Sequence, residues 1–418
     1  MHRLVFLAPL AAAFVAAPAL ADETDGPIVV TAQPLSETAD ALAACLARGC
    51  PPDQDIAATL AHAENQFLAG SYKQARTTLL KSIDRNKAQG RAFPLPVSNL
   101  YRANARVAEH VGEARSYQSS VLALRDTLRD GLGADSPRAL AAQIEVGDSR
   151  AKLGFPDEAD RIYAAVEEEA SAKGLNRIAM YARLRQAILA QISAEDSNLP
   201  SEHKRARAAL EEIVATAPPG TEDLRLTAQV TLARLDRKAG IAATTEALLR
   251  QFAASGGASR PILLAFDPIE REESDGLANR ASGDIYRAGL SGNAASLDTL
   301  KRLTAFNSIG KWVDIGFWVT PSGQVSDIEI LRSHGGTGWL KPVVEHLQSR
   351  VYAPLKADED GVNPGLYMVE RYSLTARWTD DATGTSMRRR EFTPRIERLD
   401  ITPENYAQPS IGPAADRG

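Results

Sequence analysis

Cysteine and histidine are scarce in this sequence, and their spacing excludes most metal and nucleophilic chemistry. The 418 residues include two cysteines and six histidines. No histidines stand in the His-x-x-x-His spacing of zinc sites, and two cysteines without nearby histidines fall short of the usual four ligands. A Gly-x-Ser-x-Gly nucleophile elbow is also absent. We therefore expect no metal and no other cofactor, and an enzyme is the least favoured class of function.

Basic charge is in short supply as well. The chain has 48 lysines and arginines against 53 aspartates and glutamates, a formal net charge of −5. A mildly acidic chain without a basic patch lacks the electrostatic footprint of a protein that binds the phosphate backbone. The partners that we expect are therefore proteins or peptides, not nucleic acid.

Long apolar runs are missing except at the N-terminus. Residues 1–21 have Arg3 as their charge, an apolar core and a small-x-small site that ends at Ala21, directly before Asp22. This pattern is typical of a cleavable secretory signal peptide, and its core is too short to span a bilayer comfortably. Cleavage between Ala21 and Asp22 would remove one base and no acid, which takes the net charge from −5 to −6. We predict a periplasmic mature chain without a membrane span; a retained N-terminal anchor is the alternative.

The two cysteines lie close together, at Cys45 and Cys50. In an oxidising compartment such a pair across a helix end favours a disulfide, with Gly49 in the left-handed conformation that lets the chain fold back. Two unreactive thiols or a redox pair are the alternatives.

Residues 36–256 carry the pattern of helical hairpins. Glycines that would break the helices recur at 70, 112 and 154, in steps of 42, and Gly240 lies 86 residues further on. This spacing indicates an internal repeat. The sequences Gly70-Ser71-Tyr72-Lys73-Gln74-Ala75 and Gly154-Phe155-Pro156-Asp157-Glu158-Ala159 resemble the Gly-x-Tyr-x-x-Ala corner of tetratricopeptide repeats. The resemblance implies divergent repeats stacked into an α-solenoid with a concave face.

The C-terminal part changes to strand periodicity. Alternation from Trp312 to Val319, a turn at Pro321-Ser322-Gly323 and apolar positions from Val325 to Ile330 predict a β-hairpin. A helix with Val343, Val344 and Leu347 on one face follows, and then a long alternating strand from Leu366 to Trp378, in which Glu370 is the one exception on the apolar side. Residues 396–401 suggest an added strand.

This segment resembles the C-terminal domain of the TonB energy-transducer family. The matching pieces are Phe317-Trp318-Val319, Pro321-Ser322-Gly323-Gln324-Val325, Ile328-Glu329-Ile330-Leu331-Arg332-Ser333 and Tyr352-x-Pro354. The chain departs from the family at Leu340-Lys341, where Leu-Asp is usual, and at Arg350, where a tryptophan is usual. The resemblance implies that an extended peptide binds by strand addition to the long last strand. The receiving edge would then comprise Tyr367, Val369, Arg371, Ser373 and Thr375.

The N-terminal arm carries a short β-rich segment, Ile28-Val29-Val30-Thr31-Ala32. It resembles the TonB box, the peptide of outer-membrane receptors that the TonB C-terminal domain grips. An unremarkable β-rich segment is the alternative. A further hypothesis is that this segment pairs with the receiving edge of its own chain or of a second copy.

The predicted organisation is multidomain, an α-solenoid of helical hairpins followed by a small α+β domain with an antiparallel sheet and one helix. The predicted parts are a signal peptide (1–21), an extended arm (22–35), the solenoid (36–256), a linker with a short strand and one helix (257–305), the TonB-C-terminal-like domain (306–402) and a disordered tail (403–418). We predict a non-enzymatic periplasmic adaptor or scaffold that binds protein partners through both folded parts. A TonB-like energy transducer acting on outer-membrane receptors is the alternative, although no long proline-rich spacer is visible.

Overall fold

The structure, a computed structural model, describes residues 34–197, 199–267, 269, 310–357, 365–375, 378–380, 388–390 and 395–402. The predicted signal peptide with its cleavage site, the segment 28–32, the helix expected after residue 270 and the tail from residue 403 lie outside these residues. Within the described part of the chain, no helix is both long and apolar enough to cross a membrane.

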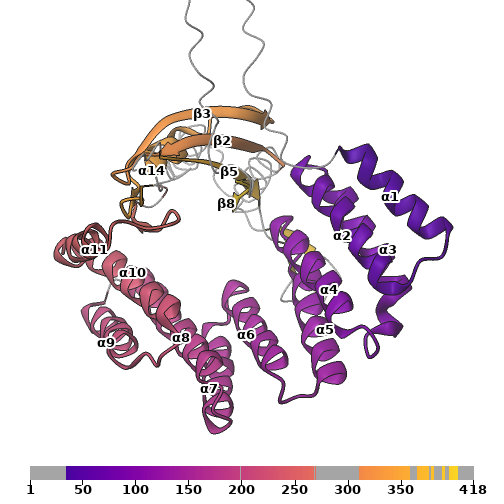
Figure 1. The fold of residues 1–418 in the computed structure, drawn as a ribbon, viewed down its shortest axis with the longest axis horizontal. Coiled ribbons are helices and arrows are strands. Elements are labelled where there is room, and N and C mark those ends of the chain that lie inside the picture. The colour runs from indigo at the N-terminus through magenta and orange to yellow at the C-terminus, as the bar shows by residue number, and fades with distance from the viewer. Residues whose placement is uncertain are drawn as a thin grey trace, which may run out of the picture.

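The N-terminal part of the molecule, residues 35–254, is helical. Its helices are α1 (Leu35–Ala47), α2 (Pro52–Leu68), α3 (Tyr72–Asn86), the 3-10 helix η1 (Lys87–Gln89), α4 (Pro94–His110), α5 (Ala114–Leu132), α6 (Pro137–Lys152), α7 (Pro156–Ala172), α8 (Asn176–Ser197), α9 (Pro200–Thr216), α10 (Glu222–Lys238) and α11 (Ala243–Ala254). From α2 onward, consecutive helices pair into hairpins that follow one another in an arc (Figure 1).

The predicted repeat is confirmed at the hairpin turns. Gly70, Gly112, Gly154 and Gly240 end the first helix of their hairpins with φ angles of 76°, 78°, 89° and 81°, the left-handed region that glycine tolerates best. The alanines that follow two of these turns, Ala75 and Ala159, are fully buried in the helix pairs. Small residues therefore let the paired helices approach closely, as the tetratricopeptide-like corner requires.

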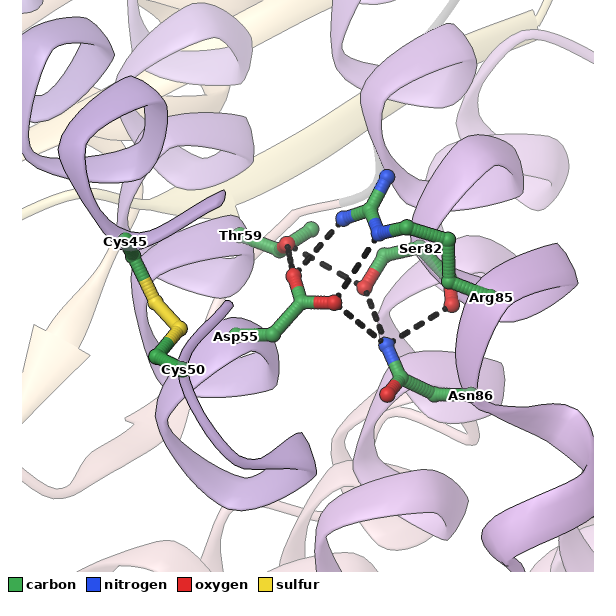
Figure 2. The surroundings of a disulfide bond; sticks show 7 residues. All are labelled: Cys45, Cys50, Asp55, Thr59, Ser82, Arg85 and Asn86. Atoms are coloured by element: carbon green, nitrogen blue, oxygen red, sulfur yellow. Dashed lines mark hydrogen bonds and ion pairs between the residues drawn. A yellow bond between two sulfur atoms is a disulfide. The ribbon is translucent and has the colours of Figure 1, made fainter. Parts of the chain in front are cut away.

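The predicted disulfide between Cys45 and Cys50 is present, with the two Cα atoms 5.3 Å apart (Figure 2). Cys45 lies in the last turn of helix α1, which ends at Ala47, and Gly49 takes a φ of 65°. The N–H of Cys50 then donates to the Cys45 carbonyl at 3.1 Å, which closes the turn. The disulfide thus fixes the connection between α1 and α2.

A polar cluster holds α2 against α3 close to this disulfide (Figure 2). The buried carboxylate of Asp55 accepts hydrogen bonds from Thr59, Arg85 and Asn86, at 2.7 to 3.0 Å. Burial alone would raise the pKa of Asp55, but the hydrogen bonds and the charge of Arg85 outweigh it and lower the pKa. The cluster is a structural ion pair between neighbouring helices.

The C-terminal part is a small α+β unit. Its elements are β1 (Leu263–Ala265), β2 (Trp312–Val319), β3 (Val325–His334), α14 (Lys341–Gln348), β4 (Val351–Tyr352), β5 (Leu366–Thr375), β6 (Trp378–Asp380), β7 (Arg388–Arg390) and β8 (Arg395–Asp400). The main sheet is antiparallel in the order β3-β2-β5-β8, while β1 pairs with β4 and β6 with β7.

One face of the main sheet is covered by α14. The alternating residues Val313, Ile315 and Phe317 are almost completely buried against Val343 and Leu347 of that helix. The predicted hairpin, helix and long strand are therefore present in the predicted order, and the added strand suggested at residues 396–401 is present as β8. The long strand is shorter than predicted, because β5 ends at Thr375 and Trp378 belongs to β6, which pairs with β7.

The predicted receiving edge is wrong in one respect, because β5 is not an edge strand. It pairs with β2 on one side and with β8 on the other, and residues 370–375 of β5 are matched one by one to residues 395–400. Beyond this ladder, the Val369 carbonyl accepts from the N–H of Ile401, and the Val369 N–H donates to the Thr402 hydroxyl. The chain's own β8 has taken the position that an added peptide would occupy.

Candidate interaction site

The main sheet lies across the open side of the helical arc, so the C-terminal unit meets both ends of the solenoid (Figure 1). At the C-terminal end of the arc, Val230 and Leu248 of α10 and α11 share an apolar core with Leu264 and Ala353. At the N-terminal end, Arg371 of β5 donates to backbone carbonyls of α2. The described chain therefore forms a closed ring.

A cavity of about 1270 Å³ lies inside this ring, between α2, α4 and β8. Its helical wall carries the apolar side chains of Leu60, Phe67 and Val107, and its sheet wall carries Leu399 and Ile401. Charged groups such as Arg106 and Glu64 stand at the same site, which gives the cavity mixed polarity. A concave site that combines apolar walls with a few polar groups is typical of ligand binding.

The alternation of β8 explains which residues face this cavity. Leu399 is paired directly with Arg371, so both side chains lie on the sheet face that is turned toward the solenoid. Arg398 lies on the opposite face and reaches Glu370. The N–H of Ile401 donates to the Val369 carbonyl, so the N–H of Ile401 points toward β5. In an antiparallel pair this direction alternates along the strand, and the N–H groups of Arg398 and Asp400 therefore point away from β5. Among the described strands, β8 is the outer one at this side of the sheet.

Arg371 joins the sheet to the end of α2. Its guanidinium is completely buried, bonds to Asp314 through two nitrogens at 2.6 and 2.9 Å, and donates to the Phe67 and Leu68 carbonyls at 3.0 and 2.7 Å. These carbonyls belong to the last turn of α2, where helix carbonyls lack helical partners and the helix dipole favours a cation. The side chain predicted to face a bound peptide thus binds the chain's own helix instead.

Trp312 completes this junction. The Arg371 guanidinium lies over the Trp312 ring, 4.1 Å from its centroid. On the solenoid side the indole lies against Gly70, where an added Cβ would come within 2.6 Å of the indole Nε1. Burial alone would lower the pKa of Arg371, but its bonds to Asp314 and the influence of Tyr72 raise it. The group stays charged.

A second buried ion pair lies beneath the opposite face of the sheet. Arg350 and Glu370 are both almost fully buried, and two Arg350 nitrogens donate to the two carboxylate oxygens at 3.0 and 2.9 Å. The hydroxyls of Tyr352 and Tyr372 and the ring of His346 complete the partners of Arg350. Burial alone would raise the pKa of Glu370, but hydrogen bonding and charge from Arg350 outweigh it and lower the pKa.

This pair connects two departures that the sequence shows separately. Glu370 interrupts the apolar side of β5, and Arg350 stands where the resemblance stated in the sequence analysis led us to expect a tryptophan. Each is costly to bury alone, whereas together they neutralise and hydrogen-bond one another. A search for complementary exceptions to apolar patterning would have found the pair; no comparable signal marks the contact of Arg371 with α2.

No group of three or more histidines, cysteines, aspartates or glutamates among the described residues is arranged to hold a metal ion. The two buried ion pairs, Arg350–Glu370 and Arg371–Asp314, are enclosed by packed side chains and helix backbone. Their geometry stabilises the fold and the junction, and none of their four side chains lines the cavity between α2, α4 and β8.

Comparison with known proteins gives a limited likeness. No family model and no curated protein matches the chain. Among solved structures, the chain is similar to the TPR-like repeats of a kinesin light chain-like protein from Podosopora anserina, with 18% identity, a TM-score of 0.37, and coverage of 49% of this chain and 95% of the other. It is also similar to BtubC from P. vanneervenii, with 12% identity, a TM-score of 0.40, and coverage of 57% and 97%. The helical-repeat architecture of this chain rests on its own hairpins.

Proposed function

We propose that this protein is a non-enzymatic adaptor or scaffold of the periplasm that holds an extended peptide of a partner protein inside the ring. The peptide would add as a strand to the outer edge of β8 and place its side chains against α2 and α4. The observation that carries the proposal is a strand edge that forms one wall of a large cavity with apolar side chains opposite. Strand addition supplies affinity through main-chain hydrogen bonds, and the side-chain surface supplies selectivity.

The other edge of the sheet, β3, is a poorer receiver. Its register against β2 shifts twice, and Asp327 near the second shift has a φ of 48°. Such bulges disrupt the row of backbone donors and acceptors and protect exposed edges against pairing. The β5–β8 ladder, by contrast, runs without a shift from Arg395 to Asp400. A regular edge within a cavity therefore favours β8.

The resemblance to the TonB C-terminal domain supports strand addition as the binding mode. In this proposal the receiving strand is β8, the neighbour of the strand β5 that the sequence predicted. Under this proposal the segment 28–32 is a candidate ligand, in the same chain or from a second copy. The signal-like residues 1–21 and the disulfide support a periplasmic location. Mass spectrometry of the mature N-terminus checks this: a start at Asp22 in the soluble fraction is expected, and a retained, membrane-bound N-terminus would favour energy transduction instead.

The binding mode can be tested by removing one backbone donor. Asp400→Pro deletes an N–H that points away from β5 and leaves the β5 ladder intact, a position at which an edge strand accepts proline. Asp400→Ala is the matched control, because it removes the same side chain and keeps the N–H. Nonapeptides selected by phage display on the chain from Asp22 onward should bind Asp400→Pro about tenfold or more weakly, the loss expected for a peptide deprived of main-chain pairing.

Two results would count against this mode of binding. Either no nonapeptide is selected, or the selected peptides bind the proline and alanine variants equally. A synthetic peptide of residues 26–34 tests the chain's own segment as ligand. If that segment competes in cis, deletion of residues 26–34 raises the affinity for the selected peptides.

A further inference from the structure

The two junctions of the ring differ in kind. The C-terminal junction is an apolar core: Val230, Ala233 and Leu248 pack with Ala258 and Leu264. Backbone hydrogen bonds add to it, since the Ala353 N–H donates to the Ile262 carbonyl at 2.8 Å and the Ala258 N–H donates to the Pro354 carbonyl at 2.7 Å. The chain itself also runs through this junction. We therefore expect the C-terminal junction to stay closed.

Within the described part of the chain, polar contacts of Arg371 and packing of Trp312 join the sheet to α2 at the N-terminal junction. Arg371 supplies its hydrogen bonds to the Phe67 and Leu68 carbonyls, and Trp312 fills the space beside Gly70. Strand β6 lies close to α5 nearby. Among the described residues, no buried apolar cluster includes side chains from both the α2–α5 helices and the sheet. Water can replace the partners of a polar junction far more readily than those of an apolar core.

We propose that the C-terminal unit is an arm that turns about the apolar junction at α10 and α11, and that Arg371 and Trp312 form a clasp that closes it onto the end of α2. The cavity between α2, α4 and β8 has one wall on each side of this clasp, because α2 and α4 belong to the solenoid and β8 belongs to the arm. Opening the clasp therefore widens this cavity and admits a partner. This last consequence rests on the proposed function, whereas the clasp itself does not.

The chain offers a matched pair of substitutions to test the clasp. Gly70→Ala introduces a Cβ that meets the Trp312 indole, in a residue with a φ of 76°. Gly154→Ala imposes the same kind of backbone strain in an equivalent hairpin turn, with a φ of 89°, but its Cβ would meet nothing within 4 Å. The difference between the two variants isolates the clasp from the strain. Arg371→Met removes the guanidinium, which is the other member of the clasp.

The readout is the distance between spin labels on introduced cysteines, measured by pulsed electron paramagnetic resonance on the full mature chain. One label replaces Lys81 of α3 and the other Lys341 of α14, both exposed. A second pair, Arg250 with Lys341, spans the apolar junction. The native cysteines are joined in the disulfide and take no label.

We expect Gly70→Ala and Arg371→Met to add a longer Lys81–Lys341 distance. Arg371→Met loses charge-assisted hydrogen bonds and should raise the ratio of open to closed molecules about tenfold or more. Gly70→Ala should raise the same ratio because its Cβ displaces the Trp312 indole. Gly154→Ala and the Arg250–Lys341 pair should keep the wild-type distances. Unchanged distances in both clasp variants, with helical content retained by circular dichroism, would overturn the clasp. The clasp would also be overturned if Gly154→Ala lengthened the Lys81–Lys341 distance as much as the clasp variants do. A lengthened Arg250–Lys341 distance would have the same meaning. Peptide binding is measured separately, so a failure to bind peptide in the cavity does not change the conclusion about the clasp.

Discussion

Replacing Glu370 by glutamine should destabilise the C-terminal unit strongly. The substitution keeps the size of the side chain and removes its charge, which leaves the fully buried Arg350 without an anionic partner. Breaking a buried ion pair by removing one member costs about 3–5 kcal/mol. Arg350 retains the hydroxyls of Tyr352 and Tyr372, so we expect the lower end of that range. The contribution of Arg398 is small, about 1 kcal/mol or less, because that side chain is half exposed.

The assay can isolate this unit from the solenoid. All four tryptophans of the chain lie at or after Trp312, so tryptophan fluorescence reports on the C-terminal unit and its junction with α2, while circular dichroism is dominated by the helices. With an m-value of roughly 1–1.5 kcal/mol/M for a unit of this size, the urea midpoint seen by fluorescence should fall by about 2 M or more.

The control is Glu345→Gln, which removes the same charge from the exposed α14 pair with Lys341. Its effect should be about 0.5 kcal/mol or less. The double variant Arg350→Met with Glu370→Leu should recover most of the lost stability, because apolar replacement of a whole buried pair is often neutral. If Glu370→Gln and Glu345→Gln shift the midpoint equally, Arg350 is not held by charge and the reasoning fails.

Two further predictions concern pH and redox state. Burial and the neighbouring Arg350 lower the pKa of His346, so its protonation opposes folding; stability of the C-terminal unit should be lost as pH falls through about 6.5, the pKa of an unfolded histidine. Urea midpoints at pH 7.5 and 5.5 should differ less in His346→Gln than in the wild type or in the exposed His334→Gln, and an unchanged difference would contradict this. Replacing Cys45 and Cys50 by serine should lower solenoid stability by about 2 kcal/mol, the loop entropy of a short disulfide, seen by circular dichroism during thermal unfolding; an unchanged midpoint would show that α1 stays docked without it.

Local pattern determined much of this fold. Glycine at the hairpin turns, small residues after them and the close cysteine pair each act within a few residues, so Gly70, Gly154 and the Cys45–Cys50 disulfide could be predicted from the sequence. The β2–β3 hairpin is likewise a contact between neighbours in the chain. Such elements follow from backbone conformation and side-chain periodicity, which need no knowledge of distant residues.

Only the tertiary structure decided what the sheet edges and buried charges do. Alternation along β5 is the same whether its outer side is free or paired, so the pattern could not show that β8 covers the expected receiving edge. Arg371 was an outward side chain by period, and it became a buried ligand of a helix end about 300 residues earlier because the arc brings α2 back to the sheet. Arg350 and Glu370 were two separate exceptions until packing placed them within hydrogen-bond distance. Contacts between distant elements depend on how the whole chain closes, and local preferences do not specify that closure.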